Sequence, residues 1–185
     1  MAITMREIGV AKADAIRAIC LDAFGTEGEE GEGPAVASLA VALLADETAQ
    51  PCLALLAEEE GEPCGCVIFS AVRIEGGDPI KAPIKVSILA PLAVSRHRHG
   101  GGIGGSLVRR GLELLRERGT EAVLVYGDPA YYSRFGFSHR HQIQAPYPLS
   151  YPAEAWMALE LRPGALDSVT GVARCGQALS APEHW

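Results

Sequence analysis

The sequence predicts one α/β domain of 185 residues, in which helices pack against a mixed β-sheet. Three observations support this prediction. Short apolar runs typical of strands alternate with stretches of helical spacing. Two of these runs flank a Glu-Gly-Glu-Pro turn and are typical of a β-hairpin. Residues 84–118 then follow the order strand, glycine-rich turn, helix, and this stretch is the centre of the prediction.

The N-terminal half predicts two helices placed between strands. A glycine- and glutamate-rich stretch, residues 25–33, separates the helices and predicts a solvated loop. Pro34 suits the first turn of the second helix. The predicted elements of this half are a strand, two helices and two strands, at residues 3–8, 12–24, 34–45, 52–57 and 65–72.

The C-terminal half predicts one long amphipathic helix and shorter elements after it. The long helix has an apolar face at helical spacing and ends near Gly119, a favourable C-terminal stop. Residues 139–151 are rich in proline and histidine and predict irregular structure. Short elements are predicted at residues 122–126, 130–134 and 156–161. The domain is expected to span residues 1–172, with a C-terminal tail at 173–185.

Composition and charge exclude several classes of protein. The 16 lysine and arginine residues against 23 acidic ones give a net charge of −7, which argues against general nucleic-acid binding. No apolar run is long enough to span a membrane, and the first residues lack the plan of a signal peptide. The five scattered cysteines suit free thiols. A cytoplasmic protein without membrane or nucleic-acid partners is therefore expected.

The apolar strand of residues 84–94 contains Pro91. Proline cannot donate to a sheet ladder, so it marks an edge strand or a bulge. If the strand is internal, a bulge would turn the N–H groups of Leu92 and Val94 away from the neighbouring strand. Those donors would then be available to a ligand.

Five of the six residues 100–105 are glycine, directly before the long helix. Such a corner favours phosphate binding, because glycines allow close approach to the backbone and a helix N-terminus offers unpaired N–H groups. Gly100-x-Gly102-x-x-Gly105, with Asp128 after the next strand, matches the dinucleotide fingerprint. Two features argue against a dinucleotide-binding oxidoreductase. The turn before the first glycine is long and polar where a tight turn is expected, and only one strand-helix-strand unit is present. That reading remains an alternative.

Two motifs resemble the GNAT superfamily of N-acetyltransferases. His99-Gly100-Gly101-Gly102-Ile103-Gly104 is similar to its Gln/Arg-x-x-Gly-x-Gly/Ala acetyl-CoA motif, and residues 131–137, Tyr-Tyr-Ser-Arg-Phe-Gly-Phe, are similar to a second signature. Within the family, the chain resembles bacterial predicted N-acetyltransferases of the YhbS type. The resemblance implies a mostly antiparallel sheet flanked by helices, with a bulged central strand that opens a coenzyme A cleft.

The resemblance also implies a reaction and a site. Acetyl-CoA would donate its acetyl group directly to a primary amine of a small molecule or peptide. The N–H of Leu92 would stabilise the thioester oxygen, and Tyr132 would protonate the departing thiolate, while Tyr131 is expected in the core. His99 replaces the usual Gln or Arg. The expected cofactor-binding residues are Leu92, Ala93, Val94, His99, Gly100, Gly101, Gly102, Ile103, Gly104, Gly105 and Ser106.

Other roles stay open at this level. Arg96 and Arg98 either attract coenzyme A phosphates or are simply solvated. Glu58 and Glu59 are weak candidates for a general base. The sequence contains no clear general base, and His99 stands where the family motif has Gln or Arg. A non-catalytic acyl-CoA sensor is therefore a further alternative.

The acceptor and the assembly are less well determined. The loop of residues 25–33 commonly borders the acceptor in such proteins, and its glutamates predict a cationic acceptor near Glu27, Glu29 and Glu30. The two His-x-His pairs, at residues 97–99 and 139–141, lack acidic or cysteine partners at suitable spacing, so no metal is expected. The oligomeric state is open, a homodimer being one option.

Overall fold

The computed structural model describes residues 2–25, 31–79 and 81–185. Within these residues eight strands form one sheet, and six of them follow the spatial order β1-β2-β3-β4-β5-β7. Their bounds are β1 (Ile3–Ile8), β2 (Leu53–Glu59), β3 (Glu62–Glu75), β4 (Val86–Val94), β5 (Ala122–Tyr126) and β7 (Trp156–Glu160). Neighbours on this path are antiparallel except β4 and β5, which are parallel. The predicted mixed, mostly antiparallel sheet is thus confirmed.

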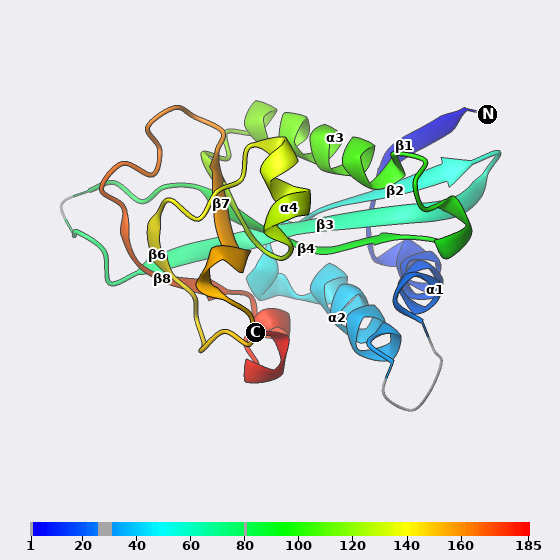
Figure 1. Cartoon of the computed structure of the whole chain (residues 1–185), viewed down its shortest axis with the longest axis horizontal. Helices are drawn as coiled ribbons and strands as arrows, with labels where there is room; N and C mark the ends of the chain where they lie inside the picture. The colour runs from blue at the N-terminus through cyan, green and yellow to red at the C-terminus, as the bar shows by residue number, and fades with distance from the viewer. Residues whose placement is uncertain (1, 26–30, 80) are drawn as a thin grey trace.

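Helices cover both faces of the sheet (Figure 1). One face carries α1 (Ala13–Phe24) and α2 (Gly33–Ala45), and the opposite face carries α3 (Ile103–Glu117). The short α4 (Pro129–Tyr132) follows β5. The predicted acceptor-binding residues Glu27, Glu29 and Glu30, in the segment between α1 and α2, lie outside the described residues.

Strand periodicity divides the core between these two faces. Along β2 and β3, Leu56 and Ile68 pack beneath α1 and α2, whereas Leu55 and Phe69 pack beneath α3. The fit of α3 is close, because a Cβ added to Gly111 would lie 2.2 Å from a ring carbon of Phe69. Glycine at this helix position therefore allows α3 to approach the sheet.

The last part of the chain is more ordered than its sequence pattern predicts. The segment predicted as irregular contains β6 (Gln142–Gln144), which pairs in parallel with β8 (Thr170–Cys175). Strand β8 also pairs with the end of β3. Beyond residue 172, where the sequence predicts a tail, Leu179 and Trp185 are buried against the core of the α1 and α2 face. These residues pair or pack with segments far away in the chain, so local sequence patterns carry little signal for them.

The centre of the sheet opens where β4 leaves β5. Strand β4 pairs with β3 as far as Val94, but its pairing with β5 extends only from Val86 to Leu89. The register against β3 advances two residues, from Val67 to Phe69, while β4 advances three, from Leu89 to Leu92. The extra residue is a bulge at Ala90 and Pro91. Since β4 pairs on both sides, the bulge is the one of the two options left by the proline that the structure contains.

Candidate functional site

The open edge of β4 presents backbone groups to a cleft. The N–H of Ser95 donates to the carbonyl of Cys64 on β3 at 2.9 Å. Because alternate residues of a strand point their N–H groups in opposite directions, the N–H groups of Val94 and Leu92 point away from β3. On that side β5 no longer pairs with β4 beyond Leu89. We infer that the bulged strand offers the amides of Leu92 and Val94 to the cleft.

The glycine-rich turn supplies a second row of amides. Gly102 is the N-cap of α3 in the left-handed conformation, with φ +77°, and Gly100 has φ +80°. The first bond of the helix joins the N–H of Ser106 to the carbonyl of Gly102 at 3.0 Å. Within the described residues no acceptor bonds the N–H groups of Gly100, Gly102, Ile103, Gly104 or Gly105. Unpaired amides at a helix N-terminus bind phosphate groups.

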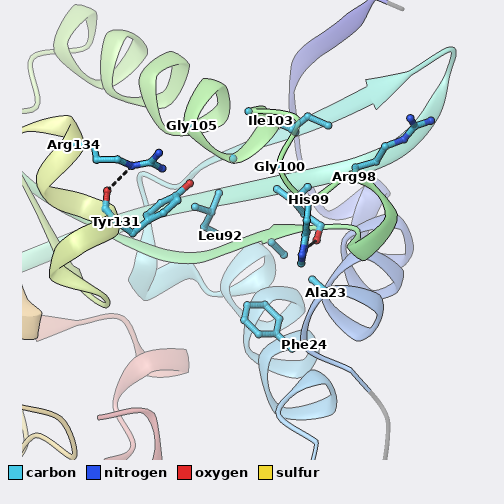
Figure 2. Close-up of a pocket in the computed structure, with 14 residues that line it drawn as sticks. Ala23, Phe24, Leu92, Arg98, His99, Gly100, Ile103, Gly105, Tyr131 and Arg134 are labelled. Atoms are coloured by element: carbon cyan, nitrogen blue, oxygen red, sulfur yellow. Dashed lines mark hydrogen bonds between the residues drawn. The ribbon is translucent and has the colours of Figure 1, made fainter.

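These two rows of amides border one cleft of about 400 Å³, which we call the cofactor cleft (Figure 2). Nine predicted cofactor-binding residues line it, namely Leu92, Ala93, Val94, His99, Gly100, Gly102, Ile103, Gly104 and Gly105. Two others, Gly101 and Ser106, do not line it: the amide of Gly101 donates to the carbonyl of Arg98, and Ser106 is exposed on α3.

The imidazole of His99 bonds to the strand edge. Its Nε2 lies 2.7 Å from the carbonyl oxygen of Val94, and since a carbonyl only accepts, Nε2–H is the donor. This contact shows independently that the peptide groups of Val94 face the cleft. In this arrangement the Nε2 proton is used in the bond to the backbone. The His99 side chain therefore links the glycine-rich turn to β4.

Basic side chains give the cofactor cleft its charge. The described residues that line it include Arg98, His99 and Arg134, and no Asp or Glu is among them. Arg98 forms an ion pair with Glu59, at the end of β2. Arg96 lies outside the lining and is held by α1, because its N–H donates to Asp22 at 2.8 Å and this bond holds the pKa of the Asp22 carboxyl below its ordinary value. The cleft therefore suits an anionic ligand.

The two tyrosines of α4 have different surroundings. Tyr131 lines the cofactor cleft (Figure 2). Its hydroxyl would lie 2.8 Å from a Cβ built on Gly104. The guanidinium of Arg134 lies 4.4 Å from the centre of its ring. Tyr132 is not a cleft residue: its ring packs edge-on to Phe137 and against Gly127. Burial raises the pKa of the Tyr132 hydroxyl well above its usual range.

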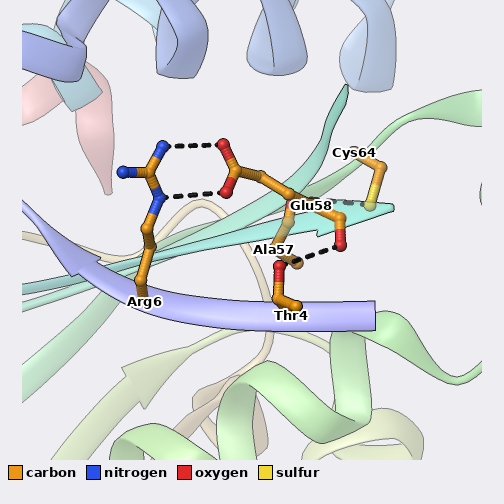
Figure 3. Close-up of polar contacts among 5 residues, drawn as sticks. All are labelled: Thr4, Arg6, Ala57, Glu58 and Cys64. Carbon is orange, nitrogen blue, oxygen red and sulfur yellow. Dashed lines mark hydrogen bonds and ion pairs between the residues drawn. The ribbon is translucent and has the colours of Figure 1, made fainter. Parts of the chain in front are cut away.

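The carboxylates considered as general bases are occupied. Glu58 accepts from Nε and Nη2 of Arg6 at 2.9 and 2.7 Å, while its backbone carbonyl accepts from Thr4 (Figure 3). The neighbouring Glu59 is paired with Arg98. Both carboxylates thus link strands or turns by ion pairs.

Sequence reasoning missed several cleft residues. Ala23 and Phe24 reach the cleft from the end of α1, and Arg134 reaches it from the turn after α4. Tyr131 was expected in the core. The paired motif Tyr-Tyr-Ser-Arg-Phe could have indicated Tyr131 and Arg134, which lie three residues apart on one helical face. No local signal marks Ala23 or Phe24, since their place depends on how α1 packs.

Two further findings concern the described part of the chain. No helix there has the length and apolar character needed to cross a membrane. Among the same residues, no three or more His, Cys, Asp or Glu side chains gather where they could hold a metal ion.

An open central sheet with a bulged strand, joined to a glycine-rich helix N-terminus, defines an acyl-CoA-dependent acetyltransferase fold. The sequence profile of the Acetyltransferase (GNAT) family matches residues 15–137. This chain belongs to that family, as its two motifs predict.

Relatives span nearly the whole chain. The chain is 38% identical to the uncharacterized N-acetyltransferase YjhQ of Escherichia coli K12 over 170 residues, which are 89% of this chain and 88% of YjhQ. Among solved structures, YhbS of Escherichia coli in complex with CoA is similar with a TM-score of 0.81 and 31% identity, covering 97% of this chain and 92% of YhbS. A GNAT acetyltransferase of Brucella melitensis in complex with acetyl-CoA is similar with a TM-score of 0.72 and 29% identity. The match covers 97% of this chain and 99% of the Brucella protein.

Proposed function

We propose that this chain transfers the acetyl group of acetyl-CoA directly to a primary amine of a small molecule or peptide. The observation that carries the proposal is the cofactor cleft, where the outward amides of β4 continue into the unpaired amides at the start of α3. Structural relatives crystallised with CoA and acetyl-CoA support the same cofactor. A cytoplasmic location remains a prediction.

The residues of the cleft suit the parts of this cofactor. The amides of Gly100 and of residues 102–105, with Arg98 and Arg134 nearby, are placed for phosphate groups. The peptide groups of Leu92 and Val94 are placed for the amides of a pantetheine chain. Acetyl-CoA, when bound, supplies a thioester whose acetyl carbon is open to attack by an amine.

The chain contributes positioning and electrostatics to this reaction. An N–H on the open edge of β4, which we assign to Leu92, donates to a carbonyl oxygen as negative charge develops on it. The attacking amine must be neutral, and because the described residues that line the cofactor cleft include no carboxylate, we infer that its proton passes to water. The leaving thiolate needs a proton from a group in the cleft.

We infer that Tyr131 supplies that proton. Its hydroxyl borders the cleft beside Gly104 and Leu92. The sequence instead predicts Tyr132, which matches the family motif. Loss of the Tyr132 proton would leave a phenolate in buried surroundings, and its raised pKa reflects that cost. The assignment of Tyr132 as the proton donor stays a prediction. Matched phenylalanine variants of Tyr131 and Tyr132 distinguish the two assignments.

The proposal is tested by incubating the protein with acetyl-CoA and a panel of primary amines, and by following both thiol release and the mass of the acetylated product. Amine-dependent thiol release with an equal amount of N-acetyl product is expected. Tight binding of acetyl-CoA without product from any amine would instead favour the acyl-CoA sensor. Binding of a nicotinamide cofactor in place of acetyl-CoA would favour the oxidoreductase.

A further inference from the structure

A second cavity lies at the end of β5, outside the cofactor cleft. Its volume is about 500 Å³, and its walls come from the end of β5, the start of α4 and the segment before β7. None of its lining residues also lines the cofactor cleft. We call this cavity the tyrosine pocket, after Tyr126 and Tyr151.

The aromatic walls of the tyrosine pocket are held in place. The rings of Tyr126 and Tyr151 lie 5.9 Å apart, and the N–H of Tyr151 donates to the hydroxyl oxygen of Tyr126 at 2.8 Å. Trp185 stacks on Tyr126 with ring centres 5.9 Å apart. The side chain of Tyr151 nevertheless remains 65% exposed. An exposed tyrosine on a supported wall offers a ring face to a ligand.

Two carboxylates give the pocket negative charge. Asp128 and Glu154 line it, and the other described residues of its lining include no lysine, arginine or histidine. In the described part of the chain neither carboxylate forms an ion pair. Aromatic faces and carboxylates both attract cations, so the pocket is complementary to an ammonium or guanidinium group.

The short helix α4 connects the two cavities. Asp128 is its N-cap and lines the tyrosine pocket, whereas Tyr131 lines the cofactor cleft. A single helical turn of four residues spans about 6 Å along its axis. A ligand group in the pocket can thus belong to the same small molecule as a group that reacts at the cleft.

The charge of the pocket fixes which group it can hold. An amine attacks a thioester only in its neutral form, and two carboxylates would favour the protonated form. A cation in the pocket is therefore not the reacting nitrogen. In the transfer itself a C–N bond forms and the C–S bond breaks, the nitrogen loses a proton to water and the sulfur gains one, so a distant cation is unchanged.

We propose that the tyrosine pocket binds a second, non-reacting cationic group of the acceptor, so that the acceptor class is diamines, polyamines or amines with a similar cationic chain. This inference rests on the proposed acetyl transfer and names the substrate class for it. It does not depend on the glutamates between α1 and α2.

The test compares two acceptors of nearly equal length, 1,4-diaminobutane and 4-aminobutan-1-ol, which has a hydroxyl in place of one ammonium. The variants are Glu154→Gln and the double variant Asp128→Asn, Glu154→Gln; asparagine preserves the N-cap of α4. Glu117→Gln, an exposed position on α3, is the matched control. We expect the variants to raise the KM for the diamine about 5- to 20-fold, with the KM values for the amino alcohol and acetyl-CoA unchanged.

An equal rise for both acceptors, or no rise for the diamine, would overturn the assignment while leaving acetyl transfer intact. If the wild-type protein acetylates no amine, the proposed function fails, and calorimetry with 1,4-diaminobutane then judges the pocket alone. Weaker binding to the double variant than to the wild type and the Glu117→Gln protein would support it. Equal binding, or none, would reject it.

Discussion

The cofactor cleft and the tyrosine pocket lie at the two ends of α4 and differ in charge and construction. The cleft is lined by Arg98, His99 and Arg134 and by backbone amides, and the pocket by two carboxylates and two tyrosine rings. One cavity suits an anion and the other a cation. An enzyme that joins an anionic cofactor to a cationic acceptor gains from this separation, because each reactant is attracted to a different cavity.

The two cavities also depend on the chain in different ways. Most of the cleft comes from one stretch, residues 92–105, whose glycines expose the backbone, and α1, α4 and the turn after α4 complete it. The pocket combines the end of β5 with the segment before β7, and Trp185 supports it from the end of the chain. Substitutions in the two cavities are therefore expected to act on different reactants.

The largest effect is expected at the wall of the cleft formed by α4. Tyr131→Phe keeps the ring and removes the hydroxyl, so turnover should fall about 10²–10⁴-fold if Tyr131 is the proton donor. Tyr132→Phe is the matched control, with a much smaller loss expected. Steady-state rates at saturating acetyl-CoA, with affinity checked by calorimetry, measure the effect. The opposite order of losses would return the role to Tyr132.

A second large effect concerns the glycine turn. In Gly102→Val a branched side chain meets a φ of +77°, and in Gly104→Val it meets the hydroxyl of Tyr131. If each variant loses two hydrogen bonds from backbone amides to phosphate, coenzyme A binding should weaken about 100-fold or more. Gly119→Val, at φ +82° outside the cleft, is the control for backbone strain alone. Near-normal calorimetric affinity in folded Gly102→Val protein would contradict the phosphate assignment.

A smaller effect is expected when one positive charge is removed from the cofactor cleft. Arg134→Ala removes a cation from the cleft, so the KM for acetyl-CoA should rise about two- to fivefold, most strongly at low salt. The KM for a cationic acceptor should not rise. Arg140→Ala, an exposed arginine nearby in sequence, is the control. A rise in KM that does not depend on salt would indicate lost packing on Tyr131 instead of lost charge.

The smallest effect concerns His141, whose ring packs edge-on to Trp156, and Trp156 in turn packs edge-on to Trp185 behind the tyrosine pocket. Nε2–H of His141 donates to the carbonyl of Trp156 at 2.9 Å, and Nδ1 accepts from the N–H of Ile143 at 3.2 Å, so the ring is neutral. Burial lowers the pKa of His141, and neighbouring His139 acts in the same direction. Below the ordinary histidine pKa of about 6.5, the unfolded chain takes up a proton that the folded chain does not.

The stability contributed by His141 should therefore be complete above that pH and decrease as the pH falls towards the lower folded pKa. His141→Asn can still accept from Ile143 but does not titrate. Thermal unfolding between pH 7.5 and 5 should show a steeper decrease in Tm for the wild type than for the variant. Parallel pH profiles would show that His141 does not contribute.

Much of the fold and part of the site follow from local sequence. Residues 3–8 and 122–126 form strands with the predicted bounds, because apolar periodicity and flanking turns specify them. Pro91 predicts an edge strand or a bulge, since a proline cannot donate to the ladder, and the pairing of β4 on both sides leaves the bulge. The glycines of residues 100–105 predict a phosphate-binding corner, because both the turn and the helix start are properties of adjacent residues.

Tertiary structure alone decided the rest. Tyr131 and Tyr132 are adjacent and chemically identical, and only the packing of α4 against Gly127 and Phe137 turns one towards the cleft and the other inward. The strand β6 and the burial of Trp185 depend on partners far along the chain. Ala23, Tyr126 and Glu154 gain their places from long-range packing in the same way. Sequence periodicity reports which face of an element is apolar, but the cavity that a side chain borders is set by the elements packed around it.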